Sequence, residues 1–388
     1  MSQDGGAIGG GRFILPRDPV ELTLAELWIE VLGVEPISVR GNFFELGGSS
    51  LQLLRVAEGV EARLGRKLPL AAFFQHATIE RLGAVVRAQG PLAFESPLLE
   101  IRARKGDRPL FLFHDLSGDV TYAYLLAHVL GPSLSVYGFQ PPGLYNDRQP
   151  HRDVGGLVDE YVKELLAVQP EGPYALGGHC TGGILAAEAA ARLAAAGHEV
   201  VPLALFSSLP WSAEGRAQYA SVTERADALY HWLDAHAEPI PYERFAALGE
   251  QEQYAYVLEG WEALDMVPAG AGVPFLRRYA DMYVLSAAAM ARHDPTRYHG
   301  RGCVFLPSEP LVEGEEVPSP AAARRQWLQV VGCDVEVQVV PGNHYSMLER
   351  EHIGDLVARV RALLAGGPTA PAGGTEEGGG HGRPAAGP

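Results

Sequence analysis

The pentapeptide Gly178-His179-Cys180-Thr181-Gly182 constrains the fold more than any other stretch of the chain. It follows a short apolar run at residues 174–176 and precedes a helical stretch at residues 184–195. A strand, a sharp turn flanked by glycines and a helix form a nucleophile elbow, where small neighbours let the backbone take a strained shape that exposes the central side chain. The pattern predicts Cys180 as a nucleophile on an α/β sheet. The alternative is a buried structural thiol.

Other short apolar runs alternate with long helical stretches after residue 107. The runs lie at residues 110–113, 136–139, 174–176, 201–206, 304–306 and 335–340. Strands separated by helices indicate a parallel sheet covered on both faces. Residues 210–300 show no strand pattern, so we expect a helical lid there, over the carboxyl edge of the sheet where ligands bind. The aromatic residues that could shape a pocket under it, or simply pack its helices, are Tyr219, Tyr230, Trp232, Trp261, Tyr279 and Tyr283.

The segment before this sheet has a different texture. Between residues 20 and 89 apolar side chains recur at i, i+3, i+4 and i+7, which predicts a small helical bundle of about 70 residues. We assign residues 1–18 and 91–107 to linkers, residues 19–90 to the bundle and residues 108–365 to the α/β domain. The glycine-rich tail at 366–388 has almost nothing to bury, so we expect disorder there.

Composition excludes several classes of function. The net charge of -16 leaves no basic cluster for nucleic acid. No run approaches the ~18 apolar residues that a membrane span needs, and no signal peptide precedes the bundle, so we expect a cytoplasmic protein. Three scattered cysteines form neither a disulfide framework nor a metal site, and we assign no chemistry to Cys303 and Cys333.

A second motif lies inside the bundle, at residues 42–51, with the sequence NFFELGGSSL. Ser49 or Ser50 could simply cap the following helix, although a helix N-terminus also suits a phosphate. The motif resembles the carrier-protein signature of nonribosomal peptide synthetases. This resemblance implies a four-helix carrier bundle with 4'-phosphopantetheine attached to Ser50, loaded by a phosphopantetheinyl transferase. Pro16, Val20 and Glu21 resemble the junction after an adenylation domain, which implies upstream synthetase modules as partners.

The α/β segment resembles the type I thioesterases that end such assembly lines. By this resemblance the family's nucleophilic serine matches Cys180, its histidine matches His344 in the loop after the last strand, and its oxyanion hole comes from the backbone N–H groups of Thr181 and Leu116. The implied fold is an α/β-hydrolase with a helical lid. Because a helix N-terminus and an imidazole lower a thiol's pKa, we expect Cys180 to be substantially ionised at neutral pH.

The acid of the triad departs from the family. The family usually has an aspartate after the strand that follows the nucleophile helix, where this chain has Ser207. Glu309, after the next strand, preserves the order nucleophile, acid, histidine and is our candidate. The alternatives are Asp115, Asp119 and Asp334, or a dyad without an acid.

These residues together predict a chain-releasing enzyme. A peptidyl thioester on Ser50 would reach Cys180 from the chain's own carrier domain, docked on the thioesterase. A thioester held on cysteine remains an activated acyl donor, so release by closure of a strained β-lactam or β-lactone ring, as in monobactam synthetases, is the function we expect. Hydrolysis and macrocyclisation are the alternatives within enzymes, including an editing hydrolase, and an inactive docking platform is the alternative outside them.

Overall fold

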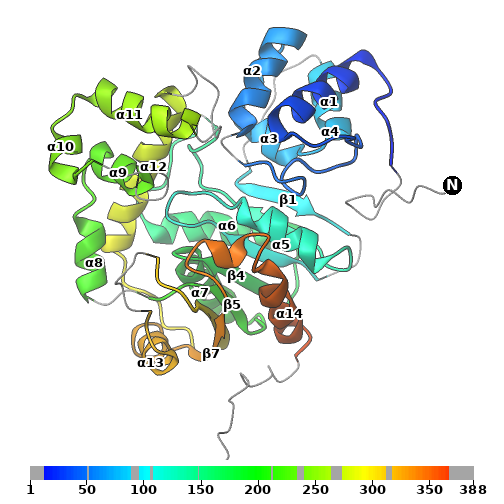
Figure 1. The fold of residues 1–388 in the computed structure, drawn as a ribbon. Helices are drawn as coiled ribbons and strands as arrows, with labels where there is room; N and C mark the ends of the chain where they lie inside the picture. The colour runs from blue at the N-terminus through cyan, green and yellow to red at the C-terminus, as the bar shows by residue number, and fades with distance from the viewer. Residues whose placement is uncertain are drawn as a thin grey trace, which may run out of the picture.

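The computed structural model describes residues 13–49, 52–88, 96–104, 108–146, 148–210, 213–233, 240–263, 273–311 and 317–366. Figure 1 shows a small helical unit, in blue, beside a larger unit in which helices flank a sheet. The predicted fold class, a helical bundle followed by an α/β domain with a helical insertion, is confirmed. None of the helices in the described part is both long and apolar enough to cross a membrane.

The small unit contains four helices among its described residues. They are α1 (Pro19–Leu32), α2 (Gln52–Leu64), α3 (Leu70–Gln75) and α4 (Ile79–Arg87). Helix α1 starts where the Asp18 side chain accepts a hydrogen bond from the Glu21 amide, and it ends at Gly33 in the left-handed conformation, φ 65°. Its Trp28 packs edge-on against Phe43, with ring centroids 5.1 Å apart, and both are buried. Helix α3 has only six residues, too few to show a helical period in the sequence, so it was implied by the resemblance to carrier domains and not by the apolar pattern.

The sheet of the large unit has seven strands in the order β1-β3-β2-β4-β5-β6-β7. Their bounds are β1 (Leu98–Arg102), β2 (Leu110–Phe113), β3 (Val136–Phe139), β4 (Ala175–His179), β5 (Leu203–Phe206), β6 (Arg301–Pro307) and β7 (Asp334–Val340). All neighbours are parallel except β1, which pairs antiparallel with β3 at the edge. This strand corrects the assignment of residues 91–107 to a linker. Only Leu99 and Ile101 of β1 are buried, too short an alternation to stand out in the sequence.

Helices cover both faces of the sheet. They are α5 (Tyr122–Leu130), α6 (Val154–Val168), α7 (Gly182–Ala195), α13 (Pro320–Val330) and α14 (Ile353–Leu364). Successive side chains of β2 enter different cores: Leu110 and Leu112 pack in one apolar cluster, Phe111 and Phe113 in the other. A strand buried on both faces has no polar alternation, which explains its continuous apolar sequence.

Five helices lie between β5 and β6 in the described residues. They are α8 (Ala213–Ala220), α9 (Arg225–Leu233), α10 (Tyr242–Ala246), α11 (Glu250–Ala263) and α12 (Val273–Ala291). Glu188 of α7, 1% exposed, anchors the chain after α12 by accepting hydrogen bonds from the amide and hydroxyl of Thr296, and it also contacts His293. The side chains of Trp232 and Trp261 lie outside the described residues.

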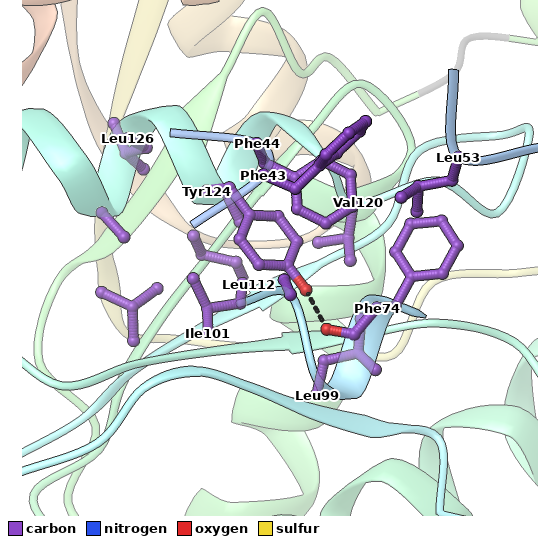
Figure 2. Close-up of a cluster of buried hydrophobic side chains, with 14 of the residues drawn as sticks. Phe43, Phe44, Leu53, Phe74, Leu99, Ile101, Leu112, Val120, Tyr124 and Leu126 are labelled. Atoms are coloured by element: carbon purple, nitrogen blue, oxygen red, sulfur yellow. Dashed lines mark hydrogen bonds between the residues drawn. The ribbon is translucent and has the colours of Figure 1, made fainter. Parts of the chain in front are cut away.

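The bundle and the sheet share one apolar cluster. Phe44 stacks on Tyr124 of α5 with ring centroids 4.0 Å apart, and the Tyr124 hydroxyl donates a 2.8 Å hydrogen bond to the Phe74 carbonyl, as Figure 2 shows. An ion pair between Glu45 and Arg102, at 2.8 Å, borders the cluster. The carrier-like motif therefore packs directly against the α/β unit.

Candidate active site

Cys180 stands directly after β4 with φ 54°, in the left-handed region that non-glycine residues rarely adopt. Only glycine fits at the two flanking positions, because a side chain there would clash with the backbone. A Cβ on Gly178 would lie 2.2 Å from the backbone of Gly182, and a Cβ on Gly182 would lie 2.2 Å from the Phe113 carbonyl. The Cys180 amide donates a 3.0 Å hydrogen bond to the carbonyl of Phe206 on β5. The geometry is that of a nucleophile elbow.

Ser207 is the other non-glycine residue with positive φ in the described part of the chain, at 41°. It follows β5 directly, and its amide donates a 2.8 Å hydrogen bond to Phe305 on β6. Its hydroxyl oxygen lies 2.7 Å from Nδ1 of His344. A non-glycine residue held in this region costs about 1–3 kcal/mol, and such strain concentrates at functional sites.

His344 reaches Ser207 from the loop after β7. Asn343 shapes this loop, because its side-chain oxygen accepts hydrogen bonds from the amides of Tyr345 and Ser346. The His344 carbonyl accepts a 2.8 Å hydrogen bond from Nε2 of His179, and the two imidazole rings lie 4.4 Å apart. Since His179 directly precedes Cys180, these contacts bring the loop of His344 to the elbow.

The protonation of Cys180 differs from the sequence expectation. Burial, and after it the nearby carboxylate of Asp115, raise the pKa of the Cys180 thiol to about 12, although the backbone N–H groups of Thr181 and Leu116 act in the opposite direction. The expectation of an ionised thiol is therefore wrong, because the loss of solvent outweighs the helix N-terminus. At neutral pH Cys180 is a thiol and needs a base to attack.

The same two N–H groups are the ones that the sequence predicts for an oxyanion hole. Their effect on the Cys180 pKa places Thr181, at the start of α7, and Leu116, in the loop after β2, beside the sulfur. That loop is fixed by Asp115, which accepts hydrogen bonds from the amide and the hydroxyl of Ser117 at 2.9 and 2.5 Å. Gly118, with φ 88°, completes the turn.

Glu309 is not brought to His344. Its amide donates to the Gly342 carbonyl at 3.0 Å, but its carboxylate is exposed and makes no hydrogen bond or ion pair within the described residues. Asp334 pairs with Arg324 at the start of β7, the strand end opposite to the His344 loop. Asp115 serves the loop after β2, and Asp119 accepts a hydrogen bond from the Thr121 amide. The hydroxyl of Ser207 holds the position on Nδ1 that an acid would occupy.

The turn before α2 contains the serine predicted to carry a phosphate ester. Ser50 lies outside the described residues, but Ser49 and Gln52 form a reciprocal cap: the Gln52 amide donates to the Ser49 hydroxyl at 3.2 Å, and the Gln52 side chain accepts from the Ser49 amide at 2.9 Å. The capping role thus falls to Ser49. No acidic residue occupies the first turn of α2, so an anionic group esterified before this helix fits its N-terminal field.

Comparisons with known proteins agree with both halves of the chain. Residues 108–364 match the family described as "Thioesterase domain", and residues 23–86 match "Phosphopantetheine attachment site". The "Probable non-canonical nonribosomal peptide synthetase (NRPS) CymA" of Salinispora arenicola is 29% identical over 91% of this chain, and "Chondramide synthase cmdD" of Chondromyces crocatus is 26% identical over 90%. The chain spans only 4% and 9% of those two proteins.

Among solved structures, "holo-AB3403 a four domain nonribosomal peptide synthetase bound to AMP and Glycine" aligns with 92% of this chain and 27% of its own length, with a TM-score of 0.58 and 24% identity. At this identity the likeness concerns the fold alone. It covers the helical bundle and the α/β unit together.

Proposed function

Because this chain belongs to the thioesterase family and carries a phosphopantetheine carrier domain ahead of its thioesterase domain, we propose that it releases a peptidyl chain from a nonribosomal peptide synthetase through Cys180. A thioesterase domain hydrolyses or transfers acyl thioesters. The observation that carries the proposal for Cys180 is the strained elbow, which aims this side chain at the sheet edge beside two backbone N–H groups.

The carrier half supplies the thioester. Such a domain bears 4'-phosphopantetheine on a serine, and when bound this group supplies a thiol that holds the acyl chain as a thioester. We assign the attachment to Ser50, as the motif predicts, because the capping role at the start of α2 belongs to Ser49, which pairs with Gln52. Loading requires a phosphopantetheinyl transferase, and the peptide comes from upstream synthetase modules.

The transfer step uses residues at three strand ends. His344 removes the proton from the Cys180 thiol, and the sulfur attacks the substrate carbonyl, whose oxyanion is held by the N–H groups of Thr181 and Leu116. The carbon–sulfur bond of the incoming thioester breaks, His344 returns the proton to the departing thiolate, and the acyl group remains on Cys180 as a new thioester. Bonds and protons balance without a further reactant.

Ser207 can replace an aspartate here because the nucleophile is a thiol. A carboxylate on Nδ1 both orients a histidine and stabilises the imidazolium. The 2.7 Å contact with Ser207 orients the ring, and a hydroxyl gives less stabilisation than a carboxylate. A thiol gives up its proton more readily than a serine hydroxyl, so the weaker support suffices.

The surroundings favour an acceptor within the acyl chain over water. The hydroxyls of Tyr283, in α12, and Tyr345, in the loop after β7, interact electrostatically with Cys180, and burial raises the pKa of both. The thiol is thus half-buried and lies near two aromatic side chains. An acyl group kept as a thioester there is activated enough to close a strained ring, a β-lactam or β-lactone.

The carrier docks in cis through its motif. Besides the Phe44–Tyr124 stack, Arg350 donates a 3.0 Å hydrogen bond to the Glu45 carbonyl, and a Cβ on Gly47 would lie 3.2 Å from the same guanidinium. Arg350 follows the loop of His344 along the chain. The docked carrier therefore contacts the segment just after the histidine loop, and a tethered substrate is presented at high effective concentration.

The test is product analysis on the intact chain loaded by a phosphopantetheinyl transferase with peptidyl-pantetheine. The proposal predicts loading that Ser50→Ala abolishes and a released product 18 Da lighter than the free acid. A free acid as the sole product replaces ring closure by hydrolysis, and a larger ring indicates macrocyclisation. If the Cys180→Ala variant released product at an unchanged rate, the enzymatic role would be contradicted, and the α/β domain would be interpreted as an inactive docking platform.

A further inference from the structure

A partly enclosed pocket lies beside the candidate nucleophile. Its cavity volume is about 30 Å³, enough for a group of only a few heavy atoms. Leu116 and Thr181, whose N–H groups flank the Cys180 sulfur, belong to its wall, and Met282 and Met290 of the lid helix α12 close the other side. A group attached to a carbonyl held at the oxyanion hole thus adjoins this pocket.

Two buried polar atoms of the wall have no partner among the described residues. They are Nε2 of His114, whose residue is 3% exposed, and Oγ1 of Thr181, whose residue is 2% exposed. A buried polar atom without a hydrogen bond costs about 1–3 kcal/mol. A ligand group that entered the pocket and bonded to these atoms would remove this cost.

The free atom of His114 is an acceptor. Its Nδ1 lies 2.6 Å from the Asp115 carbonyl, and since a carbonyl only accepts, Nδ1 carries the proton. Burial lowers the pKa of His114 to about 4, so the ring is neutral at pH 7 and Nε2 has a lone pair. The imidazole sits edge-on to Tyr161, which fixes its orientation.

The other polar side chains that line the pocket are also mostly hydrogen-bond acceptors. Among the described residues, Asp115 and Asp153 line the pocket and no lysine or arginine does. Asp115 uses Oδ1 for Ser117, and Asp153 caps α6 through the Gly156 amide. The other polar side chains that line it are His151, bonded to Glu160, and Ser286. Acceptors therefore outnumber donors on this wall.

We propose that this pocket is the subsite for the side chain of the residue whose carbonyl is joined to Cys180, and that it selects a short side chain carrying a hydrogen-bond donor, a hydroxyl or an amine. The inference rests on the proposed function, because it needs an acyl group on Cys180. His114 acts in it as a specificity-determining residue that bonds the donor.

The experiment compares three dipeptidyl N-acetylcysteamine thioesters on the full chain. Their C-terminal residues are serine, its analogue with an amine in place of the hydroxyl, and 2-aminobutyrate, which has a methyl group there. The rate of thiol release and the acyl mass on Cys180 are both recorded. We expect at least 10-fold higher acylation kcat/KM for a donor-bearing substrate than for 2-aminobutyrate. The ratio of amine to hydroxyl identifies the donor.

His114→Phe should abolish this discrimination, while His114→Gln, which keeps an acceptor, should retain it. His198→Phe, at the far end of α7, is the matched control and should behave as wild type. Equal kcat/KM for all three substrates with normal acylation of Cys180 would overturn the subsite and leave the proposed function intact. No acyl mass on Cys180 with any substrate would instead contradict the proposed function and the subsite with it.

Discussion

The ends of β4 and β5 use one backbone arrangement for two tasks. Cys180 and Ser207 each follow the last strand residue, each has a positive φ, and each donates its amide to a carbonyl of the next strand, Phe206 and Phe305 respectively. At Cys180 the chain turns at once into α7, so glycines must flank the turn. At Ser207 no helix begins before residue 213 in the described chain, so no glycine is needed. Strain therefore marks both sites, although only one leaves a sequence motif.

Removing the side chain of Cys180, at the end of β4, should have the largest effect on product release. Cys180→Ala deletes the proposed nucleophile, so we expect release of a loaded acyl chain to fall at least ~10³-fold. The measurement is single-turnover release from the carrier. Cys333→Ala is the matched control: this thiol is buried after α13, and its loss should lower stability without stopping release.

The ionisation of Cys180 gives the next largest effect. Because the pKa of the thiol is about 12, the thiolate fraction should rise roughly tenfold per pH unit from pH 7 to 10. Alkylation of Cys180 by iodoacetamide, followed by mass spectrometry with Cys180→Ala as blank, should rise in the same proportion. A rate that levels off near pH 7 would show a preformed thiolate and contradict the assignment of His344 as base.

Substitutions at the end of β5 test the positioning role of Ser207. Loss of the hydrogen bond in Ser207→Ala should lower kcat about 10-fold, since one such bond is worth about 1–1.5 kcal/mol. Ser207→Asp should restore the rate and shift the acidic limb of the pH profile upward, because a carboxylate raises the pKa of the imidazole it contacts.

Glu309→Gln is the control for this pair, since its exposed carboxylate bonds nothing in the described structure. It should leave both kcat and the pH profile unchanged. A loss in Glu309→Gln with none in Ser207→Ala would return the orienting role to the glutamate.

The smallest effect concerns the strained backbone. Glycine tolerates positive φ. The Cys180→Gly variant should therefore be more stable than Cys180→Ala, with a free energy of unfolding about 1 kcal/mol higher, and Ser207→Gly should likewise be more stable than Ser207→Ala. Cys333, which lacks positive φ, should show the opposite order. Urea denaturation measures all six variants. Identical orders at the three positions would mean that the strand ends are unstrained.

Much of the fold could be predicted because its signals are local. The central strands are buried on both faces, so runs such as residues 110–113 are continuously apolar. The apolar pattern did not predict helix α3 or the edge strand β1. Helix α3 is too short to show a helical period, and β1 has only two buried residues. Both depend on contacts with the rest of the molecule for their structure.

The candidate site was less accessible to sequence reasoning. The strand pattern placed Cys180 after one strand and His344 in the loop after the last strand. The partner of His344 depends on where that loop turns, and Asn343 sets the turn through its contacts with backbone amides. In the sequence, a serine in place of the usual aspartate indicates only that the acid is missing. The positive φ of Ser207 and its 2.7 Å contact with Nδ1 of His344 give it a role in the site. The sign of the Cys180 pKa shift depends on burial, which no local motif reports.

The most direct test is to trap the acyl group and to determine whether Cys180 or Ser207 accepts it. The chain is loaded with acyl-pantetheine, quenched in acid within the first turnover, digested and mapped by mass spectrometry. Our account predicts an acyl mass on the peptide containing Cys180, absent from Cys180→Ala and formed more slowly in Ser207→Ala. Release of product with no acyl group on Cys180 at any time, or an acyl group on Ser207 instead, would contradict it.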